Sequence, residues 1–266
     1  MTANLFRFTA LLVLIGLLAS PLHAGSVRYP AIGNIDLREG TIELWLTPTV
    51  ELYPDLEEGQ YQGLMSLFSL SVPDGFSMGA SWYAKQGSRD LRSQLHVSMG
   101  HAEQKNALIP VPGGGVADKR WQRGEMHHVA LTWRGTEMAL YADGEQVGGR
   151  SQALGFSGRL AGCELIFGNA RNRDAGLILH AVRVSRTAHD AETLKHAEPA
   201  ARPDTLLLDR FDDESLGEDG TTRAEVIAGL TGETGGTLHG GYHGTRSPEP
   251  GLVLNRNETD DQTEND

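Results

Sequence analysis

MHHVALTWRGTEMALYADGEQVG, residues 126–148, is the stretch that decides the fold of this chain. Apolar and polar side chains alternate through Met126–Trp133 and Thr136–Asp143, as they do where successive residues of a strand point to opposite faces. Little more than Arg134-Gly135 separates the two segments, which favours a tight hairpin. Asp143-Gly144 supplies the positive φ angles of a primed turn, so residues 145–149 should return as a further strand. The stretch predicts an antiparallel meander.

The same pattern continues on both sides of this meander, from about Gly40 to Arg186. In TIELWLT, residues 41–47, Ile42, Leu44 and Leu46 would share one face, and Glu43 and Trp45 the other. Gly, Pro and Asp-Gly punctuate the other expected strands, which are residues 62–70, 76–83, 91–99, 163–169, 177–185 and 205–211. The one convincing helical turn is residues 190–196, with an acidic start and a basic end.

About ten strands with almost no helix must hide their sheet edges by stacking two sheets or by closing into a barrel. We therefore predict an all-β, two-sheet antiparallel β-sandwich that forms one domain over residues 25–211. The single cysteine, Cys163, excludes an intramolecular disulfide, and its alternating surroundings predict a buried strand position.

Residues 1–24 have the layout of a signal peptide. Arg7 precedes an apolar run from Phe8 to Ala19, and the small residue Ala24 follows. The run is about 12 residues, where a span needs about 20. We expect cleavage near Ala24-Gly25, no membrane span afterwards, and a secreted, periplasmic or cell-surface location; an uncleaved anchor is the alternative.

The C-terminal part differs from the body in composition. Residues 212–254 form a Gly-rich acidic extension that could add strands, and residues 255–266 hold five acids, one base and no apolar side chain, which predicts a disordered tail. We expect Thr205–Phe211 to complete the N-terminal unit by pairing beside residues 26–32 or at the adjacent edge; a truncated second unit is the alternative.

The formal net charge is −12, from 23 basic and 35 acidic residues, and no basic stripe interrupts it. Nucleic acid is therefore not expected as a partner, because its phosphates require clustered Lys and Arg.

Four segments in register carry a family resemblance. They are GTIELWLTP (40–48), the stretch 126–148, LIFGN (165–169) and LHAVRVSRTAHDAETL (179–194). Together they resemble laminin-G-like or pentraxin-like jelly-roll domains of the concanavalin A-like lectin/glucanase superfamily, over roughly residues 32–211. The resemblance implies a jelly-roll β-sandwich. The chain departs from the family at Met126, where an aromatic residue is frequent, and at His180-Ala181, where Asp-Glu is frequent; a calcium or rim-carboxylate role at that pair is in doubt here.

Sugar binding needs exposed aromatic rings beside hydrogen-bonding groups, because pyranose rings present apolar C–H faces edged by hydroxyls. Trp82 and Tyr83 end an expected strand next to a polar loop, and Trp121 lies in a charged loop. These three residues are the candidate ligand-binding residues. The alternative is that they are rim aromatics covering the core, as Trp45 and Trp133 should be packing residues inside strands.

Calcium is the metal to consider, because it prefers carboxylate and carbonyl oxygens supplied by loops. Asp209, Asp212 and Asp213 cluster after the last strong strand and form the candidate metal site; a solvated acidic loop is the alternative. His127-His128 occupy adjacent strand positions, so their rings should point to opposite faces and cannot share one metal.

Catalytic patterns are weak. Glycosidases of this superfamily place paired carboxylates about 5.5 Å apart on one strand, but Glu43 stands alone, and no G-x-S-x-G elbow occurs. We therefore expect no enzyme and no catalytic residues. The favoured function is an exported recognition or adhesion module for a glycan or an envelope or matrix protein. The alternatives are a glycoside hydrolase-like enzyme and a structural component of a surface assembly.

Overall fold

The computed structural model describes residues 25–73, 75–88, 91–101, 121–135, 137–151, 159–169, 175–212, 224, 226–227, 237–239, 242–243 and 252–254. The expected signal peptide (1–24), the acidic tail (255–266) and most of the Gly-rich extension lie outside the described residues.

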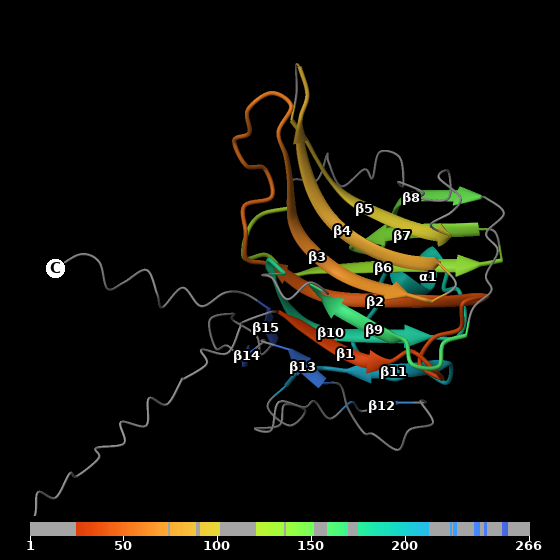
Figure 1. Ribbon diagram of the computed structural model, residues 1–266. Coiled ribbons are helices and arrows are strands. Elements are labelled where there is room, and N and C mark those ends of the chain that lie inside the picture. Colours follow the sequence, from red (N-terminus) through yellow and green to blue (C-terminus); the bar gives the residue numbers. More distant parts are fainter. Residues whose placement is uncertain are drawn as a thin grey trace, which may run out of the picture.

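Two antiparallel sheets form the body of the protein (Figure 1). The six-stranded sheet has the order β13-β1-β9-β3-β4-β5, with β1 Ser26–Pro30, β3 Tyr61–Ser71, β4 Phe76–Gln86, β5 Leu91–His101, β9 Glu164–Gly168 and β13 Thr237–His239. The nine-stranded sheet has the order β12-β11-β10-β2-β6-β7-β8, and β15 lies between β10 and β14. Its strands are β2 Glu39–Pro48, β6 His127–Arg134, β7 Glu137–Ala142, β8 Glu145–Ser151, β10 Leu177–Ser185, β11 Thr205–Asp209, β12 Val226–Ile227, β14 Tyr242–His243 and β15 Leu252–Leu254. The predicted β-sandwich is confirmed.

The core lies between the sheets and is filled by alternate residues of each strand. On β2, Ile42, Leu44 and Leu46 are fully buried in it, while Glu43 and Trp45 face the other way. β6 pairs with β7 as a hairpin in which Trp133 is opposite Met138. Asp143 and Gly144 follow with φ values of 51° and 77°, and β8 returns along β7. The meander predicted from residues 126–148 is confirmed.

The C-terminal strands β11 and β13 pair at edges of different sheets. β11 pairs with β10 and β12 in the nine-stranded sheet, and Leu206, Leu207 and Leu208 are buried there. The place beside β1 is taken by β13 instead. β11 is therefore paired and buried at a sheet edge, as the expectation for residues 205–211 required, but the place beside residues 26–32 belongs to β13. β11 covers the edge of β10, the most thoroughly buried strand, whose apolar residues would otherwise be open to water.

One helical turn, α1 Ala191–Leu194, covers the outer face of the nine-stranded sheet. Asp190 caps it by accepting a hydrogen bond from the Thr193 backbone N–H at 2.9 Å. Leu194 packs outside the main core against Ala130 and Tyr141. Among the described residues, no helix has the length and apolar character needed to cross a membrane.

Candidate functional site

Small residues, mostly serines, line the outer face of the six-stranded sheet along β3, β4 and β5. We call it the serine face; its half-buried members on β3, β4 and β5 are Ser66, Ser69, Ser77, Gly79, Ser81 and Ser98. They align in rows across the strands, because Ser69 pairs with Gly79, which pairs with Ser98. Figure 1 shows that these three strands are strongly curved. At these six described positions the serine face therefore offers hydroxyl groups on short side chains, with the larger side chains of His96 and Ile166 beside it.

Two tyrosines stand at one end of the serine face. The Tyr83 ring lies 5.4 Å from the Tyr61 ring and 5.5 Å from the His96 ring, measured between centroids. Tyr61 is 65% exposed, and Tyr83 is half-buried. Gly63 pairs directly with Tyr83, and the space above Gly63 is open. This tyrosine pair, Tyr61 and Tyr83, provides the accessible aromatic surface that sugar binding requires.

Trp82 and Trp121 do not share this position. They are 0% and 2% exposed, and their rings stack inside the sandwich at 5.1 Å. Trp82 donates a hydrogen bond to Ser93 Oγ at 2.7 Å, and Trp121 stacks on His127 at 3.9 Å. The prediction that these two tryptophans are exposed is therefore wrong. Adjacent residues of a strand face opposite ways, so a surface position for Tyr83 requires an interior position for Trp82.

Sequence reasoning missed Tyr61 and His96. Tyr61 is opposite Lys85, and His96 is opposite Ser81, so only the strand register brings them to Tyr83. Burial lowers the pKa of His96 below its usual value, which keeps the imidazole neutral at pH 7. A neutral imidazole both donates and accepts hydrogen bonds, as a sugar hydroxyl does.

A buried ionic cluster occupies the outer face of the other sheet. Arg183 donates from Nε and Nη2 to the two carboxylate oxygens of Glu43, each at 2.7 Å, and His128 Nε2 lies 3.2 Å from Glu43 Oε1. Burial alone would raise the pKa of Glu43, but the bonds from His128 and Arg183 hold that pKa at about 2. Both side chains of the Glu43–Arg183 pair are 0% exposed. Glu43 is thus a structural anion rather than a proton donor at a cleft.

The depressed pKa of Glu43 predicts a loss of stability in acid. A carboxylate with a lowered folded-state pKa stabilises the fold fully above its unfolded value of 4.5, and this contribution is lost as pH falls toward about 2. The loss should be about 3 kcal/mol at the lower limit. It is measured by denaturant unfolding from pH 6 to pH 2, with Glu43→Gln as the variant that lacks this component. A pH dependence identical in the two proteins would contradict the assignment.

The calcium prediction concerned Asp209, Asp212 and Asp213. Asp209 is 0% exposed; its Oδ2 accepts a hydrogen bond from the Tyr29 hydroxyl at 2.7 Å, and its Oδ1 accepts one from the Phe211 N–H at 3.2 Å. Asp212 lies 3.6 Å from Arg210. Asp213 is outside the described residues, and within them no three His, Cys, Asp or Glu side chains gather as metal ligands. Calcium binding therefore stays a prediction.

Comparisons with known proteins agree with the two-sheet fold. The laminin G-type family model described as "Concanavalin A-like lectin/glucanases superfamily" matches residues 23–194. No curated protein matches the sequence.

The solved structures to which this chain is similar include three proteins of low sequence identity. A proposed carbohydrate binding protein from Bacteroides ovatus is 14% identical, with a TM-score of 0.42; the alignment covers 82% of this chain and 58% of that one. Domain 4 of AbnA, an extracellular arabinanase from Geobacillus stearothermophilus, in complex with arabinotriose, is 14% identical, with a TM-score of 0.38 and coverages of 64% and 70%. The heptameric SAP-like pentraxin from Limulus polyphemus is 14% identical, with a TM-score of 0.31 and coverages of 65% and 81%.

The family match spans both the hairpin stretch and the buried Glu43–Arg183 pair, and it covers well over half of the sequence. This chain belongs to the concanavalin A-like lectin/glucanases superfamily.

Proposed function

We propose that this chain is an exported, non-enzymatic recognition module that binds a glycan on the tyrosine pair and the adjoining serine face. The observation that supports this function is the accessible Tyr61–Tyr83 pair at the end of a face built of small hydroxylated residues. Export is supported by the signal-peptide layout of residues 1–24.

The two parts of the surface would do different work. The tyrosine rings cover the apolar C–H face of one pyranose ring, and this contact excludes water. The serine hydroxyls and His96 then exchange hydrogen bonds with hydroxyl groups of the following sugar units. Each of these hydrogen bonds replaces a hydrogen bond to water. The stacking on the tyrosines therefore contributes most of the affinity, and the serines set the orientation of the sugar.

The described carboxylates support a binding role over hydrolysis. Glu43 is neutralised by Arg183 inside the protein, and the serine face carries no acidic side chain among its described members. A retaining glycosidase needs two carboxyl groups about 5.5 Å apart across the bond that it cleaves. The proposed site lacks that pair within the described part of the chain.

Tyr83→Ala and Tyr61→Ala should each weaken glycan binding about tenfold, because each removes one stacked ring. Tyr83→Phe keeps the ring and should bind almost as the wild type does. Affinity electrophoresis through gels that contain neutral or acidic polysaccharides identifies the ligand, and titration calorimetry with its oligosaccharides gives Kd.

Met126→Ala is the matched control, because Met126 is 49% exposed but lies outside the serine face. It should leave Kd unchanged. If Tyr61→Ala and Tyr83→Ala bind every responsive glycan as tightly as the wild type does, the tyrosine pair is not the site. If the wild type binds no glycan and instead forms a stable complex with an envelope protein, the glycan function itself fails.

A further inference from the structure

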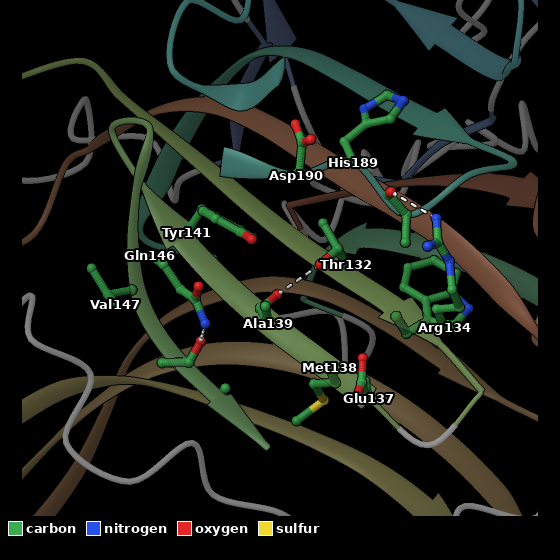
Figure 2. A pocket seen from close by; sticks show the side chains of 14 residues that line it. Thr132, Arg134, Glu137, Met138, Ala139, Tyr141, Gln146, Val147, His189 and Asp190 are labelled. Carbon is green, nitrogen blue, oxygen red and sulfur yellow. Dashed lines mark hydrogen bonds between the residues drawn. The ribbon is translucent and has the colours of Figure 1, made fainter. Parts of the chain in front are cut away.

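A groove crosses the outer face of the nine-stranded sheet, on the opposite side of the sandwich from the serine face. It has a volume of about 810 Å³, and residues of β6, β7, β8 and the segment 188–190 line it (Figure 2). This volume lies within the range of small-molecule binding pockets, about 300–1,000 Å³. Neither the tyrosine pair nor the serine face contributes to it.

The floor of the groove holds a buried tyrosine with an available hydroxyl. Tyr141 is only 6% exposed, and its ring packs against Ala130 and Leu194. Its hydroxyl makes no hydrogen bond with any described residue, and Tyr141 lines the groove. In Figure 2 the ring lies along the floor with its hydroxyl end directed toward Thr132. The packing therefore holds one polar group at a defined point of the groove.

The pKa of Tyr141 supports this picture. Burial raises that pKa above its usual value, and the negative charge of Asp190 raises it further. The phenol thus stays protonated and can both donate and accept a hydrogen bond. Thr132 adds a second floor hydroxyl, whose bond to the Ala139 carbonyl is 3.5 Å long. The two hydroxyls belong to neighbouring strands and line the same groove.

The rest of the lining admits a ligand close to the sheet. Ala139, Gly148 and Gly149 line the floor beside Tyr141 and carry at most a methyl group, and the side-chain amide of Gln146 lies over Gly149. Gln146 supplies an exposed amide, whose one bond to a described residue is a 3.4 Å contact with the Gly148 carbonyl. A ligand lying on this floor would meet hydrogen-bonding groups on two sides.

The charges of the groove disfavour an anion. Arg134 is its only fixed cation among the lining residues, and this guanidinium pairs with Glu39 at 2.8 Å. Glu137 and Asp190 are both exposed at the lining. An uncharged ligand rich in hydroxyl groups avoids repulsion from these carboxylates and can donate hydrogen bonds to them.

We propose that this groove is a second binding site, which takes a neutral sugar of one or two rings through the Tyr141 hydroxyl, Thr132, Gln146 and Asp190. The inference goes beyond the proposed function, because it uses the other outer face and other residues. With both sites filled, one module holds two glycan chains at once, and its avidity for a dense glycan surface exceeds the affinity of either site.

The test uses the mature chain with the double substitution Tyr61→Ala/Tyr83→Ala, which removes the first site. Neutral disaccharides (cellobiose, maltose, lactose and mannobiose) are titrated while the backbone amide signals of Gly148 and Gly149 are followed by NMR. At least one disaccharide should shift both signals and saturate. Adding Tyr141→Phe, which keeps the packed ring and removes only the hydroxyl, should raise Kd about fivefold, the effect of one hydrogen bond.

Tyr53→Phe is the matched control, since it removes a phenol hydroxyl outside the groove; it should leave Kd unchanged. Thr132→Val is a second variant and should weaken binding to a similar degree as Tyr141→Phe. The inference is overturned if no disaccharide shifts Gly148 and Gly149, or if Tyr141→Phe binds as tightly as its parent. If a disaccharide still binds the groove but glycan binding by the wild type does not depend on Tyr61 and Tyr83, only the proposed function is contradicted.

Discussion

Glu43→Gln lowers the free energy of unfolding by about 3–5 kcal/mol, because it leaves the Arg183 guanidinium buried without its counter-ion. Both side chains are fully buried, and two 2.7 Å hydrogen bonds join them. Arg183 also donates to the Glu198 carbonyl at 2.9 Å, so the pair fastens the segment after β10 to the sheet. The substitution therefore disturbs both the sheet and the segment that carries α1.

Chemical denaturation at pH 7 measures this loss. Glu39→Gln is the matched control on the same strand, because the Glu39–Arg134 pair is exposed to 34% and 63%. It should cost no more than about 1 kcal/mol, as exposed ion pairs do. The double substitution Glu43→Gln/Arg183→Met should recover part of the loss, since it removes the unpaired charge. If Glu43→Gln is as stable as the wild type, the Glu43–Arg183 pair is not buried in solution.

Trp82→Ala lowers the free energy of unfolding by about 3–5 kcal/mol, the usual cost of deleting a large ring from a packed core. Trp82 is 0% exposed and stacks with Trp121, while its indole N–H is bound to Ser93. The substitution removes this contact and leaves a cavity between the sheets. Its neighbour Tyr83 lies on the outer face, so Tyr83→Ala should change stability by less than about 1 kcal/mol.

The two neighbours therefore separate stability from binding. Thermal and denaturant unfolding should report a large loss for Trp82→Ala and a small one for Tyr83→Ala. Glycan titration should report the reverse: Tyr83→Ala should bind weakly, and the folded fraction of Trp82→Ala should bind as tightly as the wild type does. A Trp82→Ala protein with wild-type stability and reduced glycan affinity would place Trp82 at the ligand and contradict the burial described above.

Much of the fold follows from local pattern. The alternation in residues 41–47 correctly predicted which side chains of β2 enter the core, and Asp143-Gly144 correctly predicted the turn between β7 and β8. The strand containing Trp82 and Tyr83 was also predicted, but its inner face was not. Both residues are aromatic and lie next to a polar loop, which favoured a surface position for both, whereas the alternation of Phe76, Met78 and Ala80 with small residues places Trp82 on the apolar face.

The sequence by itself determined a chain of short alternating strands, their turns and therefore a two-sheet antiparallel sandwich, because period-two alternation and turn chemistry act over a few residues. Only the tertiary structure decided which strands are neighbours. It placed β13 beside β1 and β11 beside β10, and it brought Tyr61 from β3 next to Tyr83 from β4. Register between distant strands depends on how the two sheets fill their shared core, so a surface assembled from several strands cannot be read from any one of them.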